Sequence, residues 1–126
     1  MSGAPTTGLI LFAHGARDAA WATPFEAVAV RVRAQRPVWQ VALAYLELMA
    51  PDLPLAAATL VQAGCRRIHI VPMFLGSGGH VRRDLPALVQ QLRDQHPSVQ
   101  WSLHAAIGEH PDVIEAMAMA ALDNTD

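Results

Sequence analysis

Four short apolar runs alternate with four segments of helical periodicity along the 126-residue chain, and this alternation restricts its fold more than any other feature. The nearly unbroken apolar runs are typical of strands buried on both faces of a parallel sheet. The alternation predicts an α/β fold, a four-stranded parallel sheet with helices on both faces. Because crossovers are right-handed, few topologies remain, and we expect the flavodoxin-like strand order 2-1-3-4. The runs are residues 8–13, 41–45, 68–71 and 99–103.

Start and stop signals divide the helical segments. The Thr-Pro-Phe-Glu sequence at residues 23–26 predicts a capping box with Pro at the first helical position. Asp-Leu-Pro occurs at 52–54 and again at 84–86, which predicts two helix starts with an Asp cap. Gly64 marks the end of the second helix. The last helix is expected to begin near His110 and to bury an apolar stripe in the core, formed by Val113, Ile114, Met117 and Leu122.

The size and composition of the chain favour one compact domain over residues 1–126, with a structured core of about 8–122. Hydrophobic residues make up 52% and charged residues 16% of the chain. The net charge of −2 and the lack of a basic run argue against nucleic-acid binding. No signal peptide is visible, and the apolar runs are too short to span a membrane. We therefore expect a cytoplasmic protein.

Two residue types narrow the chemistry. All nine basic residues are Arg, so a Lys nucleophile, a Schiff base and a P-loop Lys are excluded. The single cysteine, Cys65, excludes an internal disulfide framework and a thiolate metal cage. Since Cys65 follows a predicted helix-ending glycine, we interpret it as a packed structural thiol.

Open parallel sheets bind ligands at the carboxyl ends of their strands, where the strand order reverses. In the predicted order, residues 13–18 and 73–83 meet at that point. The second segment is long for an α/β connection and contains Gly76, Gly78 and Gly79. It is neither a P-loop nor a GxGxxG fingerprint. Its glycines would let the backbone approach a flat ligand or bind an anion.

Two histidines, His14 and His80, fall on these two segments. Neutral imidazole binds divalent cobalt, nickel, zinc and iron, and it accepts protons near neutral pH. Glu47 follows the second strand, where a carboxylate would bind a metal ion or take up a proton; a solvated Glu is the competing interpretation. Of the other histidines, His69 is expected in the core and His96 on the surface. The remaining two, His104 and His110, flank the end of the fourth strand without an assigned role.

These segments resemble the sirohydrochlorin chelatases of the CbiX/SirB type. Residues 11–18, Leu-Phe-Ala-His-Gly-Ala-Arg-Asp, are similar to the opening motif of that family. The most specific similarity is residues 71–86, and residues 45–47 and 107–111 add to it. The resemblance covers about residues 8–122. Ala16 departs from it, because relatives commonly have Ser there, which removes a hydroxyl group but no metal ligand.

The resemblance implies a chelatase-like fold, no organic cofactor, and a homodimer with a cleft like that of two-domain members. Carried over by position, His14 and His80 are metal-binding and catalytic, and Glu47 delivers metal or accepts protons. Sirohydrochlorin carries many carboxylates, which Arg17, Arg82 and Arg83 could pair with. Solvated surface Arg is the alternative. The glycines expected to line the tetrapyrrole are Gly78 and Gly79.

The predicted reaction is insertion of Co(II) or Fe(II), as substrate, into sirohydrochlorin with release of two protons. It would serve cobalamin or siroheme biosynthesis. One alternative is nickel insertion into the same ring, since imidazole sites do not separate these ions by affinity alone. Another is a non-catalytic carrier of metal or tetrapyrrole. A His-dependent phosphatase fits poorly, because no Arg directly precedes His14.

Overall fold

A single parallel sheet organises the chain in the computed structural model, which describes residues 6–76 and 78–125 and, at His80, the backbone alone. The strand order is β2-β1-β3-β4, which confirms the predicted topology. The strands are β1 (Thr6–Ala13), β2 (Gln40–Tyr45), β3 (Cys65–Pro72) and β4 (Gln100–Leu103). The α-helices are α1 (Thr23–Gln35), α2 (Leu53–Gln62), α3 (Gly79–Gln95) and α4 (Pro111–Asp123), with short 3-10 helices η1 (Ala19–Ala22) and η2 (Ile107–Glu109).

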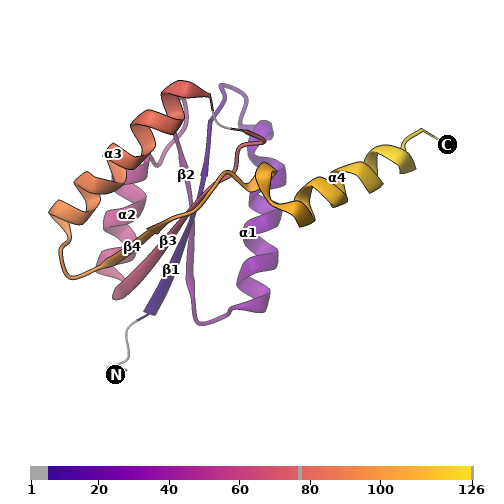
Figure 1. The fold of residues 1–126 in the computed structure, drawn as a ribbon. Coiled ribbons are helices and arrows are strands. Elements are labelled where there is room, and N and C mark those ends of the chain that lie inside the picture. Colours follow the sequence, from indigo (N-terminus) through magenta and orange to yellow (C-terminus); the bar gives the residue numbers. More distant parts are fainter. Residues whose placement is uncertain (1–5, 77, 126) are drawn as a thin grey trace.

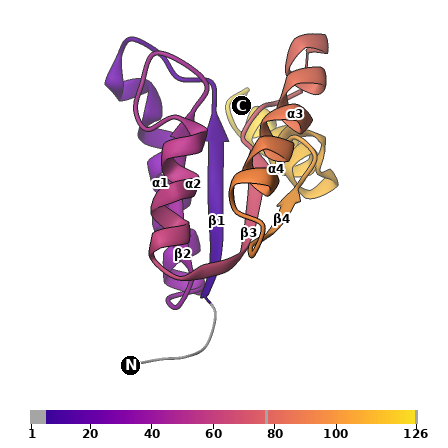
Figure 2. The ribbon, with the colours of Figure 1, turned by 90° about the vertical axis from the view of Figure 1, so that its left-hand side faces the viewer.

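Helices cover the two faces of the sheet unequally. Figure 1 shows α2 and α3 on one face and α1 on the other, while α4 points away from the sheet. Figure 2, turned to the α2–α3 side, shows α2 beside β1 and β2 and α3 in front of β3 and β4. Within the described residues, no helix has the length and apolar character needed to cross a membrane.

The central strand β1 is buried on both faces, which explains its continuous apolar sequence. Ile10 and Phe12 belong to the larger core beneath α2 and α3, with exposures of 0% and 1%. Leu9 and Leu11 pack instead with Ala29 of α1. Hydrophobic burial therefore fixes β1 at the centre of the sheet.

The second helix follows its sequence signals. The Asp52 carboxylate accepts a hydrogen bond from the Leu55 N–H at 3.0 Å, so it caps α2 as predicted. Gly64, with φ of +98°, follows the end of this helix. The prediction for α1 was wrong in its cap: Thr23 is already helical, and the chain enters α1 from η1 without a side-chain cap.

The predicted start of the third helix at Asp84 was wrong. The helix begins at Gly79, its N-cap is Gly78, and Pro86 lies inside it. The apolar stripe explains the difference: Val81 lies one turn before Leu85, and both pack against the core beneath α3. Core packing thus extends the helix upstream of its Pro and makes part of the expected loop helical.

The apolar stripe of α4 was predicted to be buried in the core of its own chain, and this prediction was also wrong. No residue of α4 is buried, and Val113 is only half-buried. Ile114, Met117 and Leu122 are 53%, 40% and 61% exposed. The helix formed as expected, but it leaves the sheet and keeps its apolar side open.

Candidate functional site

His14 and Glu47 are brought together by backbone hydrogen bonds between the chain segments that follow β1 and β2. The Leu46 N–H donates to the Ala13 carbonyl at 2.9 Å, and the Glu47 N–H donates to the His14 carbonyl at 3.0 Å. Gly15 has φ of +95°, and a Cβ there would overlap the Glu47 carbonyl oxygen. The close approach requires glycine at position 15. These hydrogen bonds hold Glu47 beside His14, at the ends of β2 and β1.

The loop after β3 is held beside the end of β1, next to His14, by a hydrogen bond and a ring contact. The Met73 N–H donates to the Phe12 carbonyl at 2.7 Å. The next residue, Phe74, is buried, and its ring stacks on the exposed His14 imidazole with centroids 4.1 Å apart. The backbone carbonyl of Phe74 accepts a hydrogen bond from the Gly108 N–H at 2.9 Å. Sequence reasoning missed Phe74, because a single aromatic residue after a strand gives no periodic signal.

His80 lies in the first turn of α3, and its side chain lies outside what the structure describes. The N-cap residue of the helix is Gly78, which makes no side-chain hydrogen bond to the first N–H groups of the helix. A Cβ on Gly78 would meet nothing within 4 Å, and one on Gly79 would meet only the Arg83 side chain at 3.9 Å. The structure therefore leaves open space beside both predicted tetrapyrrole-binding glycines.

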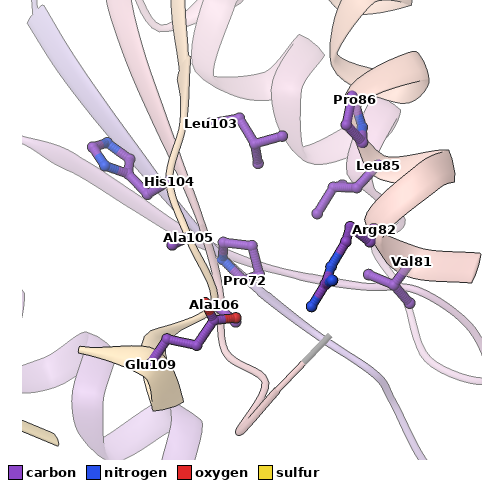
Figure 3. A pocket seen from close by; sticks show the side chains of 10 residues that line it. All are labelled: Pro72, Val81, Arg82, Leu85, Pro86, Leu103, His104, Ala105, Ala106 and Glu109. Carbon is purple, nitrogen blue, oxygen red and sulfur yellow. The ribbon is translucent and has the colours of Figure 1, made fainter. Parts of the chain in front are cut away.

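The three predicted arginines have different surroundings. Arg17 is exposed between β1 and η1, and Arg83 is exposed on α3. Arg82 lines a cavity of about 240 Å³ between α3 and the chain segment after β4. Figure 3 shows the Arg82 side chain entering this cavity from α3 and Glu109 bordering it from the opposite side.

The remaining histidines have distinct environments. His69 is half-buried on β3, and its Nδ1 lies 2.9 Å from Nε2 of His104 after β4. Burial, then the neighbouring His104 and Arg67, lower the pKa of His69. His110 caps α4, because its Nδ1 accepts from the Asp112 N–H at 3.1 Å. The fourth, His96, is half-buried next to the Trp101 ring.

Two further titratable groups are structural. Cys65 is fully buried at the start of β3, at the opposite end of the strand from the candidate site, and burial raises its pKa despite Arg66. Tyr45 ends β2 near the site, and burial, then the charge of Glu26, raise its pKa. Among the side chains that the structure describes, no three His, Cys, Asp or Glu form a closed metal cage.

The fold is that of an α/β protein with an open parallel sheet, and the candidate site lies at its topological switch point. The CbiX family model matches residues 8–123. The chain therefore belongs to the CbiX family.

Two similar proteins support this assignment. The sirohydrochlorin cobaltochelatase of Methanocaldococcus jannaschii is 31% identical over 88 residues, which cover 70% of this chain and 62% of that relative. The solved structure of a CbiX protein from Marinobacter aquaeolei VT8 is 31% identical, covers 94% of this chain and 96% of that chain, and has a TM-score of 0.80. The chain thus spans less than two thirds of the archaeal relative.

A third similarity concerns the fold alone. The sirohydrochlorin chelatase SirB from Bacillus subtilis subspecies spizizenii, solved in complex with cobalt, is 23% identical with a TM-score of 0.74. The match covers 94% of this chain but 50% of SirB. One copy of this fold therefore corresponds to half of the longer protein.

Proposed function

We propose that the chain is a chelatase that inserts Co(II) or Fe(II) into sirohydrochlorin. The observation that carries the proposal is the His14–Glu47 contact at the switch point of the sheet, in a member of the CbiX family. The archaeal relative is named a sirohydrochlorin cobaltochelatase, which indicates the same ring and metal class. Nickel as the metal and a cytoplasmic location stay predictions.

The reaction places a divalent ion between four ring nitrogens and releases two pyrrole protons. In the proposal, His14 and His80 bind the incoming ion and replace part of its water shell. Their ligation is incomplete, so the ion can transfer to the macrocycle. Glu47 accepts a pyrrole proton, since its backbone is held next to that of His14 and its side chain is exposed.

The same proposal assigns the macrocycle to the space beside the first turn of α3. Gly78 and Gly79 leave room there for a flat ring. The carboxylates of sirohydrochlorin would pair with Arg17 and Arg82, and the N-terminus of α3 would add favourable interactions with negative charge. Organic cofactors have no part in this chemistry.

A homodimer completes the proposal. The apolar side of α4 lies outside the core of its own chain, and exposed apolar patches commonly mark protein interfaces. One copy corresponds to half of SirB, so a second copy would supply the other half of such an assembly. We therefore assign the apolar side of α4 to contact with a second copy.

The test is anaerobic steady-state insertion of Co(II), Fe(II) and Ni(II) into sirohydrochlorin, followed by absorbance and corrected for the uncatalysed rate. Many turnovers are expected with Co(II) or Fe(II). His14→Ala and His80→Ala should each lower kcat at least about 100-fold, and Glu47→Gln should lower it about 10- to 100-fold. His96→Ala serves as the matched control and should keep wild-type turnover.

Other outcomes would change the assignment. A single metallation per protein would indicate a carrier, and a clear preference for Ni(II) would favour the nickel chelatase. Wild-type rates in both His variants, with folding checked by circular dichroism, would show that the chemistry lies elsewhere.

A further inference from the structure

A second pair of imidazoles lies outside the candidate site. His69 Nδ1 and His104 Nε2 are 2.9 Å apart, with His69 on β3 and His104 directly after β4. Their ring centroids are 5.1 Å apart. The Trp39 ring also stacks on His69, with the centroids 6.0 Å apart and an angle of 18° between the ring planes. The pair is thus positioned by the sheet and by an aromatic side chain.

The strand register places this pair on the α1 side of the sheet. His69 pairs laterally with Leu9, which packs with α1, and with Ser102, two residues before His104. In Figure 3 the ring of His104 turns away from Leu85 and Pro86 of α3. His69 lies opposite Leu9, five residues before His14, so the pair is separated from His14 along the strands.

The surroundings leave room for further ligands. His104 lines a cavity of about 500 Å³ that Glu109 and His110 also line. Its side chain is exposed, whereas His69 is half-buried. An ion held on the cavity side of His104 would be open to water molecules from that cavity.

The distance between the two nitrogens can be compared with the distance between two nitrogens that bind one metal ion. Two imidazole nitrogens bound at about 2.1 Å, with a right angle at the ion, lie about 3.0 Å apart. A tetrahedral angle would open this distance to about 3.4 Å. The observed 2.9 Å is close to the first of these distances. With ring centroids 5.1 Å apart the two rings point nearly at each other, so each ring must tilt toward the shared ion when it binds.

The tautomers of the two rings also permit metal binding. Without an ion, one ring nitrogen donates its proton to the other. When an ion binds, that proton moves to the second nitrogen of the same ring, so both facing nitrogens present lone pairs.

The geometry points to a second metal site, in which His69 Nδ1 and His104 Nε2 bind one divalent transition-metal ion of the class that imidazole prefers, such as Zn(II), Co(II) or Ni(II). The site does not depend on the proposed chelatase activity, because it uses none of the residues assigned to that reaction.

Zinc alone is the probe, because it is diamagnetic and allows NMR of the ring nitrogens. Long-range ¹H–¹⁵N spectra of the metal-free full chain would be recorded during a zinc titration. We expect the His69 Nδ1 and His104 Nε2 resonances to shift together, with one ion bound by each His69–His104 pair. Each of His69→Gln and His104→Gln should weaken this binding at least about tenfold and abolish the shift of the remaining partner.

His96→Gln is the matched control, since His96 is also half-buried beside an aromatic ring. It should leave the paired shift unchanged. A zinc titration that shifts His14 or His80 but leaves His69 and His104 in place would overturn the site and show an ordinary hydrogen bond between two imidazoles. The same result would follow if either Gln variant, folded by circular dichroism, kept the shift of its partner.

Discussion

At the scale of single residues, Gly15 positions the candidate site through its backbone. Gly15→Ala combines a positive φ with overlap of the Glu47 carbonyl, so we expect a loss of at least about 2 kcal/mol in the free energy of unfolding. Gly64→Ala separates the two effects, because Gly64 also has positive φ but open space around it. That control should cost only about 1 kcal/mol. Equal losses of unfolding free energy in the two variants, measured by urea denaturation, would contradict the role of the Glu47 contact.

The thiol of Cys65 offers a test of burial. Its raised pKa means that the folded state holds the proton more tightly than the unfolded state. The resulting stabilisation is complete below the ordinary thiol value of 9.0 and is lost as pH rises toward the folded value. At pH 8 a thiol reagent should label the native protein at least about 100-fold more slowly than the denatured protein. Rapid labelling of native protein would show that Cys65 is accessible.

Sequence reasoning located His14 and Glu47 because chemistry and strand ends can both be seen in the sequence. It could not find Phe74, whose stacking on His14 depends on the path of a loop. Nor could it pair His69 with His104, which are 35 residues apart and meet only through the parallel register of β3 and β4. Side-chain contacts between strands require the register, and the sequence pattern does not determine it.

At the scale of elements, two identical Asp-Leu-Pro sequences have different structural roles. Asp52 caps α2, whereas Asp84 lies inside α3. Asp52→Ala should therefore lower the free energy of unfolding by about 1 kcal/mol. Asp84→Ala, the matched control, should leave it unchanged within about 0.5 kcal/mol. Similar losses in both variants, measured by thermal and urea denaturation, would favour two Asp-capped helix starts.

The strands and the helix order were predictable, because burial on both sides of a sheet produces continuous apolar runs. The start of α3 was not, since a local Pro signal competed with Val81, whose contact with the core is a tertiary feature. For α4, periodicity indicated an apolar side correctly but did not say which surface covers it. A helix that packs on its own sheet and a helix that packs on another chain show the same periodicity of apolar residues.

At the scale of the whole molecule, the proposed homodimer would cover the open side of α4. If a second copy covers it, sedimentation equilibrium should give the mass of two chains, with dissociation on dilution. Ile114→Glu places a charge in this apolar surface and should shift the protein to monomers, weakening association at least about tenfold. Chelatase activity per chain should then fall if the second copy completes the cleft.

Val30→Glu is the control for this experiment. Val30 is 61% exposed on α1 and Ile114 is 53% exposed on α4, so the two changes put the same charge on similarly accessible helix positions. The Val30 variant should remain dimeric, because α1 already packs against its own sheet through the opposite side. If both variants stay dimeric, the interface lies elsewhere. If wild-type protein sediments as one chain at all concentrations, the α4 surface has another partner, and the site must act with the groups of a single copy.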